Sequence, residues 1–247
     1  MTPATPRPRG MAHLAHLGDV AVGFSDAALD VAEDAGTRGA DLPAAVEAVA
    51  PGAVAVRMRQ VHGADVAVVR RAELPAGGLV DGVDALVTAE PGIALVVRSA
   101  DCVPVVLADP DAGVVGVAHA GRAGLVEGVV AATLATMTDL GARSVRAWIG
   151  PAVCGSCYEV PQAMREEVAA LVPQAHAETT WGTPALDIVA GVRAQLAAGG
   201  VAEVELVDRC TREDPALHSH RRDAAAAGRL AGIVARVSPA GRKTEAS

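Results

Sequence analysis

The stretch IALVVRSADCVPVVLADPDAGVVGVAHA, residues 93–120, decides the fold. It contains three apolar runs of strand length, at residues 93–98, 103–108 and 114–118. The turn signal Asp-Pro-Asp-Ala-Gly at 109–113 separates the last two runs and predicts an antiparallel hairpin. Because several strands follow one another here without an intervening helix, a mixed sheet is favoured over a strictly alternating parallel one.

Other segments add strands and helices on both sides of this stretch. Short β-branched runs predict strands at residues 53–57, 66–69, 85–88, 145–149 and 204–207. Periodicity predicts helices at residues 124–140, 161–171, 184–197 and 224–237. The first of these helices is expected to end at Gly141, and the next two to begin with a proline. The pattern predicts the α/β class (mixed α+β), as a layered sandwich of β-sheets flanked by helices.

The two ends of the chain differ in composition from its middle. Residues 1–12 are rich in proline and arginine, and residues 238–247 resemble them, so both segments are predicted to be disordered. Between them there is no linker, repeat or low-complexity insert. One domain over residues 13–237 is therefore predicted.

Composition and charge exclude several classes of function. With only four aromatic residues (Phe24, Trp148, Tyr158 and Trp181), the core must consist of Ala, Val, Leu and Ile, and an aromatic-stacking RNA module is ruled out. The net charge of −8 disfavours nucleic acid and anionic lipid surfaces as partners. No apolar stretch reaches the roughly 20 residues of a membrane helix, and the N-terminus lacks the apolar core of a secretory signal. Four cysteines do not make a disulfide framework, so we expect a cytoplasmic protein with free thiols.

Three short segments each place one metal-ligand side chain near the end of a predicted strand. They are RQVHG at 59–63, RSADCVP at 98–104 and AHAG at 118–121, and they carry His62, Cys102 and His119. Three protein ligands with an open fourth position are typical of catalytic zinc. Two other interpretations stay open: a buried cysteine with two unrelated turn histidines, and a Cys102 nucleophile activated by His119.

Further residues are candidates for anion or metal binding. Arg98, Arg221 and Arg222 suit phosphate, because the guanidinium group binds oxyanions with two hydrogen bonds, although surface ion pairs would also explain them. Cys154-Gly-Ser-Cys157 could be redox-active or half of a zinc ribbon. Since there is no second Cys-x-x-Cys, a turn with buried thiols is favoured.

Several strings together resemble one known family. QVHGADV, DALVT, SADCVPVVLAD, GVAHAGRAG, IGPAVCGSCYEV and SHRRD occur in the order typical of the laccase-domain (YfiH) family, also described as multicopper polyphenol oxidase-like. The resemblance implies a single laccase-domain-like catalytic domain over residues 13–237. It implies a zinc ion held by His62, Cys102 and His119, with copper as an alternative metal. It also implies purine nucleoside phosphorylase activity on adenosine, inosine and methylthioadenosine, with adenosine deaminase as a side activity.

The chain departs from the family pattern in two places. The family's N-terminal GGVS-type turn and LNL segment are nearly absent, and only Gly23-Phe24-Ser25-Asp26 resembles them. The family commonly has HAGWRG, whereas this chain has HAGRAG, which places Arg122 where an aromatic residue is usual. We expect Arg122 at the rim of the site, where it can stack on a purine or hold phosphate, and Tyr158 as another wall of the pocket. The match of Cys157-Tyr158-Glu159-Val160 to a family string implies that the Cys-x-x-Cys turn has a structural role and lines the site. The expected partners are a purine nucleoside and phosphate, with no nucleic acid and no membrane, and the oligomeric state is left open.

Three other functions are retained as alternatives. A copper-dependent polyphenol oxidase would need more histidines than the seven present. A cytoplasmic hydrolase that edits peptidoglycan precursors is the second. A non-enzymatic metal-binding module is the third, and it would need a fourth ligand that these motifs do not offer.

Overall fold

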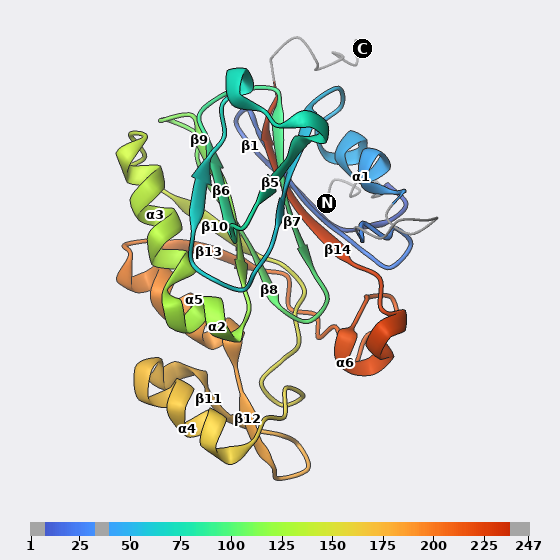
Figure 1. Cartoon of the computed structure of the whole chain (residues 1–247), viewed down its shortest axis with the longest axis vertical. Coiled ribbons are helices and arrows are strands. Elements are labelled where there is room, and N and C mark those ends of the chain that lie inside the picture. Colours follow the sequence, from blue (N-terminus) through green and yellow to red (C-terminus); the bar gives the residue numbers. More distant parts are fainter. Residues whose placement is uncertain (1–7, 33–39, 238–247) are drawn as a thin grey trace, which may run out of the picture.

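Two six-stranded β-sheets form the centre of the computed structural model, which describes residues 8–32 and 40–237 (Figure 1). The first sheet has the order β1 (Met11–Leu17), β2 (Val20–Ser25), β14 (Leu230–Arg236), β7 (Ile93–Ser99), β3 (Val54–Arg59), β5 (Leu79–Asp81). The second has the order β13 (Glu203–Leu206), β10 (Arg146–Ile149), β8 (Val103–Asp109), β9 (Val114–Ala120), β6 (Ala85–Thr88), β4 (Val66–Val68). A third, two-stranded sheet pairs β11 (His176–Glu178) with β12 (Pro184–Leu186).

Both large sheets are mixed. Strands β8 and β9 form the predicted antiparallel hairpin, in which Val103 pairs with Ala120 and Pro104 with His119. The pairs β3–β7, β4–β6 and β10–β13 are parallel. The hairpin register places the start of β8 beside the end of β9, so residues next to Cys102 and His119 lie together.

Most of the α-helices cover the outer faces of the two large sheets. The α-helices are α1 (Leu42–Val49), α2 (Arg122–Glu127), α3 (Val129–Asp139), α4 (Gln162–Leu171), α5 (Ile188–Ala198) and α6 (His220–Asp223). Single 3₁₀ turns are η1 (Arg71–Glu73), η2 (Ala76–Gly78), η3 (Pro173–Ala175) and η4 (Ala224–Ala226). In Figure 1, α2, α3 and α5 lie on the side of the second sheet and α1 on the side of the first. The expected layered sandwich is confirmed.

The core has three layers, each built almost entirely from aliphatic side chains. Between the two sheets, β-branched residues of both pack with Phe24 and Trp148. A second layer joins the second sheet to α2, α3 and α5, and a third joins the first sheet to α1. Aliphatic burial of this kind supplies the main driving force for folding, at about 25 cal/mol per Å² of apolar surface.

The prediction of a helix at residues 224–237 is wrong. Its last part is β14, which lies between β2 and β7 and is buried along almost its whole length. A strand buried on both faces has no polar–apolar alternation, so a continuous apolar run can be mistaken for a helix. Glycine at position 232 lets β14 pack closely against its neighbours, because a Cβ atom there would lie 2.9 Å from Val97 Cγ1 and 3.0 Å from Phe24 Cε1.

Two other predicted helices have different bounds. The segment at 184–197 begins as β12, and α5 starts only after Asp187, whose Oδ1 accepts a hydrogen bond from Ala190 N at 2.8 Å. The segment at 124–140 is two helices, because Gly128 has a left-handed φ of 84° that separates α2 from α3.

The expectations for the chain ends are only partly covered by the structure. Residues 1–7 and 238–247 lie outside the described residues. The predicted N-terminal disordered segment of residues 1–12 is too long, because Met11 and Ala12 are buried and begin β1. Among the residues described, none of the helices combines the length and apolar character that crossing a bilayer requires.

Candidate active site

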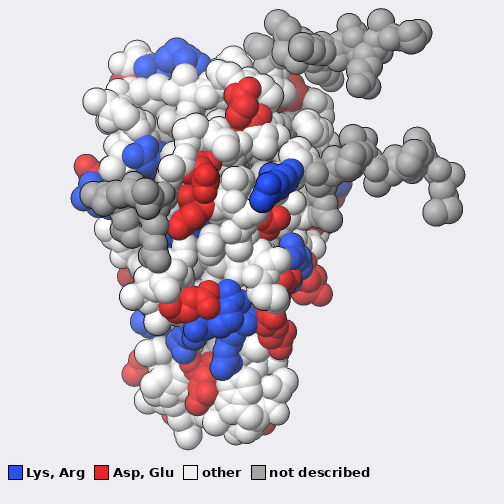
Figure 2. Space-filling model, turned by 90° about the vertical axis from the view of Figure 1, so that its right-hand side faces the viewer, with Lys and Arg blue, Asp and Glu red and all other residues white. Residues whose placement is uncertain are grey.

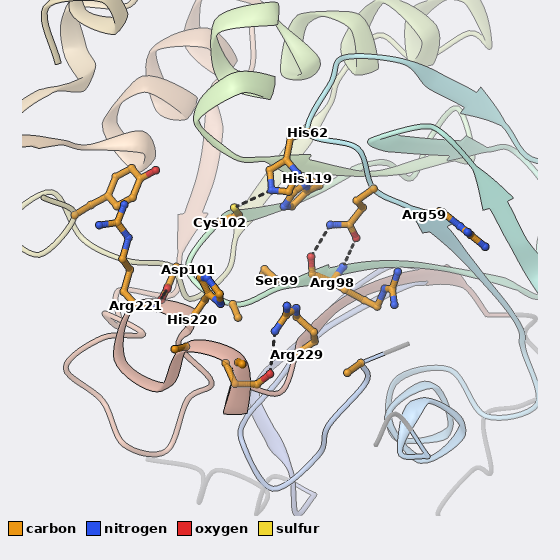
Figure 3. A pocket seen from close by; sticks show the side chains of 17 residues that line it. Arg59, His62, Arg98, Ser99, Asp101, Cys102, His119, His220, Arg221 and Arg229 are labelled. Carbon is orange, nitrogen blue, oxygen red and sulfur yellow. Dashed lines mark hydrogen bonds between the residues drawn. The ribbon is translucent and has the colours of Figure 1, made fainter. Parts of the chain in front are cut away.

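A cavity of about 620 Å³ opens where the end of β9 and the loops after β3 and β7 meet the segment around α6 (Figure 3). Its walls come from segments that are far apart in the sequence. The polar and aromatic residues that line it are Arg59, Gln60, His62, Arg98, Ser99, Asp101, Cys102, His119, Tyr158, His220, Arg221 and Arg229.

His62, Cys102 and His119 come together at one end of this cavity. One ligand atom from each lies within 4.8 Å of the other two, and Cys102 Sγ is 3.9 Å from His62 Nε2. The two imidazole rings meet edge to face, with centroids 4.8 Å apart. His119 is buried, whereas His62 is exposed and has a left-handed φ of 65°. Figure 3 shows all three side chains converging on the same space.

Asp84 holds the two histidines in place, and the sequence reasoning did not identify it. Its fully buried carboxylate accepts hydrogen bonds from the backbone N–H groups of Val61, His62 and Gly63 at 3.0, 3.0 and 2.8 Å. His119 Nδ1 donates to Asp84 Oδ1 at 2.9 Å. This leaves Nε2 of His119 as the nitrogen available to a metal, which is the usual arrangement behind a metal-binding histidine.

The same contacts shift the acidities of the cluster. Burial alone would raise the pKa of Cys102, but hydrogen bonds from His119 and His62 outweigh it and lower that pKa to about 6. Burial would lower the pKa of His119, but its contacts with Asp84 and Cys102 raise it to about 9. The directions of the two shifts favour a thiolate on Cys102 and a protonated ring on His119 when no metal is bound.

The three residues fit a transition metal. Gly121 lies beneath them, and a Cβ atom there would lie 2.9 Å from His62 Cδ2 and 3.1 Å from Cys102 Sγ. Glycine at this position thus keeps the ligands' space open. One thiolate and two imidazoles suit both zinc and copper, and three protein ligands would leave a fourth coordination position for water or substrate.

Guanidinium groups surround the rest of the cavity. Arg98 and Arg221 line it as expected, and so do Arg59 and Arg229, which we had not singled out. Arg221 Nη1 donates to Glu159 O at 2.9 Å, and its guanidinium lies 4.6 Å from the centre of the Tyr158 ring. Arg59 could have been identified in the sequence, because it directly precedes the QVHG motif.

Asp101 connects the metal-ligand loop to the arginine-bearing segment. It has a φ of 90°, uncommon for a residue other than glycine, and it precedes Cys102. Thr211 Oγ1 donates to its Oδ1 at 2.6 Å, and Arg221 N donates to its Oδ2 at 2.6 Å. These contacts fix the position of the Arg221 backbone relative to the loop that carries Cys102.

Two predicted anion ligands do not line the cavity. Arg222 donates to the carbonyl oxygens of Thr211, Asp214 and Leu217 at 2.7, 3.1 and 2.6 Å, and it pairs with Asp223 at 2.7 Å. Its guanidinium therefore holds a loop together. Arg122 is the first residue of α2 and is not among the residues that line this cavity.

The Cys-x-x-Cys motif is also placed differently from our expectation. Cys154 and Cys157 do not line this cavity, although Tyr158 does. They lie instead beside Cys210 and Glu213, with one ligand atom from each of the four residues within 4.8 Å of the others.

Comparison with known families gives a match over most of the chain. The family model described as multi-copper polyphenol oxidoreductase laccase matches residues 20–237. A purine nucleoside phosphorylase of Streptomyces coelicolor is 59% identical over 182 residues, which cover 72% of this chain and 74% of the relative. A purine nucleoside phosphorylase of Mycobacterium tuberculosis is 48% identical over 186 residues, which cover 74% of this chain and 73% of the relative.

A solved structure shows the same fold. YlmD from Geobacillus stearothermophilus superposes with a TM-score of 0.78 at 29% sequence identity, over 90% of this chain and 93% of that one. A hypothetical protein from Bacillus licheniformis, YfiH, has a TM-score of 0.77 at 23% identity, over 89% of this chain and 93% of that one.

Proposed function

This chain belongs to the multi-copper polyphenol oxidoreductase laccase family, and on that premise we propose that it is a purine nucleoside phosphorylase. The observation that carries the proposal is that one cavity contains both a cluster of metal ligands and several arginines. The two relatives described above, which bear this activity in their names, support it. We further propose adenosine, inosine and methylthioadenosine as substrates, adenosine deaminase as a side activity, and the cytoplasm as the location.

In phosphorolysis, a phosphate oxygen forms a bond to C1′ of the ribose while the bond from C1′ to the purine nitrogen breaks. The electron pair of the broken bond leaves with the purine, so negative charge moves from the phosphate to the base. We assign phosphate binding to Arg98 and Arg221, because guanidinium groups bind oxyanions with paired, charge-assisted hydrogen bonds. Both side chains line the cavity, and Arg221 keeps a fixed position through its backbone bond to Asp101.

The purine is assigned to the end of the cavity near His62, Cys102 and His119. Zinc held by these three residues would supply a Lewis acid at that end. Asp84 keeps the proton of His119 on Nδ1, so the ligand nitrogen needs no rearrangement during the reaction. We assign Tyr158 to the phosphate side of the cavity, because its ring lies against the Arg221 guanidinium and helps to hold that group in place.

The alternative activities have less support in the same cavity. Polyphenol oxidation by several copper ions needs many imidazole ligands, and the described lining holds three histidines, His62, His119 and His220. Acyl transfer through Cys102 is favoured by its low pKa, but a thiolate that binds a metal is not free to attack.

The test is a phosphate-dependence assay. We expect purified protein to release hypoxanthine from inosine only when inorganic phosphate is present, and we expect Cys102→Ala to lose the activity together with its metal. His16→Ala is the matched control, because His16 is exposed on β1, away from the cavity lining. Equal release with and without phosphate would show a hydrolase instead.

A further inference from the structure

Four potential metal ligands meet outside the cavity. They are Cys154, Cys157, Cys210 and Glu213, and one ligand atom of each lies within 4.8 Å of the others. Cys157 Sγ is 3.3 Å from Glu213 Oε1, and Cys210 Sγ accepts a hydrogen bond from the backbone N–H of Cys154 at 3.4 Å. Cys157 is buried, Cys154 and Cys210 are half-buried, and Glu213 is exposed.

The four ligands form two pairs with the same spacing. Cys154-Gly-Ser-Cys157 is one pair, and Cys210-Thr-Arg-Glu213 is the second, with a glutamate in place of the last cysteine. Each pair sits in a tight turn: Cys157 N donates to Cys154 O, and Asp214 N donates to Cys210 O, both at 3.0 Å. Two such turns that face each other are the usual frame of a four-coordinate structural zinc site.

Backbone contacts bring the two turns together. Ala152 and Cys210 form a parallel bridge, in which Thr211 N donates to Ala152 O at 3.0 Å. Main-chain hydrogen bonds thus hold the four ligands close to one another before any metal binds. Tetrahedral zinc with thiolates at about 2.3 Å requires ligand atoms about 3.8 Å apart, a separation within the spread of this cluster.

We propose that Cys154, Cys157, Cys210 and Glu213 bind a second zinc ion, which has a structural role. Three thiols each lose a proton to solvent on binding, and with the glutamate they give the loaded site a net charge of −2. Positive groups lie close by. Arg212 Nη1 donates to Cys157 O at 3.1 Å, and Arg193 lines a second, smaller cavity that the cluster also lines. Thiolate-rich tetrahedral sites select zinc over hard cations such as Mg²⁺ and Ca²⁺.

The proposed ion would stabilise two walls of the catalytic cavity. The first turn leads directly into Tyr158. In the second, Thr211 donates to Asp101, which also binds the backbone of Arg221. A metal that joins the two turns would therefore hold the stacked Tyr158 and Arg221 in position from outside the cavity, without contacting a substrate.

The experiment counts zinc per chain by elemental analysis, and it needs no activity measurement. We expect two zinc ions in the native protein, one in Cys102→Ala, one in Cys210→Ser and none in the double variant. His176→Ala is the matched control, because His176 is exposed on β11 and belongs to neither ligand cluster, and it should keep both ions. One ion in the native protein and none in Cys102→Ala would overturn the proposal and leave the cavity site intact.

A spectroscopic measurement covers the case in which Cys210→Ser fails to fold. Cobalt loaded into Cys102→Ala, which lacks the cavity thiolate, should show intense sulfur-to-cobalt charge-transfer absorption from the remaining three thiolates. Absence of that absorption would overturn the proposal, as would iron in place of zinc. An intact mass that is lower by two hydrogens before reduction would also overturn it, because it would show a disulfide where the metal is expected.

Discussion

Asp84 shows how one buried side chain organises the candidate active site. Its carboxylate accepts three backbone hydrogen bonds from the loop of His62 and one from the ring of His119. The ligands His62, Cys102 and His119 could be identified from sequence, because their residue types limit the chemistry. Asp84 could not, because an aspartate in DALVT carries no sign of where its hydrogen bonds go until the fold places it.

Replacing Asp84 by Asn should weaken metal binding at the cavity by about 10–100-fold, the usual cost of losing the partner of a metal-binding histidine. The amide presents N–H donors to backbone N–H groups, so the loop of His62 also loses its anchor. Competition with a chromophoric zinc chelator measures the change. Asp139→Asn, an exposed substitution at the end of α3, is the control, and an unchanged affinity in Asp84→Asn would contradict the assigned role.

Two arginines provide a matched test of phosphate binding. Arg221→Ala keeps the backbone bond to Asp101 but removes the guanidinium from the cavity, so KM for phosphate should rise about tenfold or more, given about 1.5–3 kcal/mol for a hydrogen bond to a charged group. Arg122→Ala should leave KM unchanged, because Arg122 is outside the cavity lining. Steady-state kinetics at varied phosphate concentration measure both KM values. A larger rise in KM for Arg122→Ala than for Arg221→Ala would contradict the assignment.

At the scale of helices and strands, the sequence pattern was informative where turn signals bounded short apolar runs. The hairpin of β8 and β9 was predicted with nearly correct ends, because Asp109–Gly113 interrupts the apolar pattern. The strand β14 was predicted as a helix, since a strand buried on both faces shows no alternation. The pairing of β14 with β2 and β7 joins residues more than 100 positions apart, and no local pattern encodes it.

The β8–β9 turn contains a carboxylate whose loss should destabilise the fold in a pH-dependent way. Asp109 accepts hydrogen bonds from the backbone N–H groups of Ala112, Arg143 and Ser144. Burial would raise its pKa, but these bonds outweigh it and hold the pKa below its ordinary value. Its stabilising contribution is therefore complete above the pKa of the unfolded chain, about 4, and is lost as the pH falls toward the lower folded value.

Asp109→Asn should accordingly lower the free energy of unfolding at pH 7 by about 1–3 kcal/mol. Urea denaturation at a series of pH values measures it. The difference between the native protein and the variant should shrink as the pH falls below about 4, because the native carboxylate is then protonated. A difference that stays constant down to acid pH would show that the carboxylate's charge is not involved.

At the scale of the whole molecule, two sheets packed on an aliphatic core bring together cavity residues from position 32 to position 229. Acidic side chains lie among the arginines on the face shown in Figure 2, in keeping with the net charge of −8. Such a surface favours a small anionic ligand held in a cavity by a few placed arginines over a long polyanion held by a broad basic surface. That this protein does not bind nucleic acid stays a prediction, which rests on this distribution of charge.

The most direct test of the central account is ³¹P NMR of the purified protein with inosine and inorganic phosphate. The account predicts that a ribose 1-phosphate signal grows in step with hypoxanthine release, and that neither product forms with Cys102→Ala. Hypoxanthine accompanied by free ribose, with the phosphate signal unchanged, would contradict it.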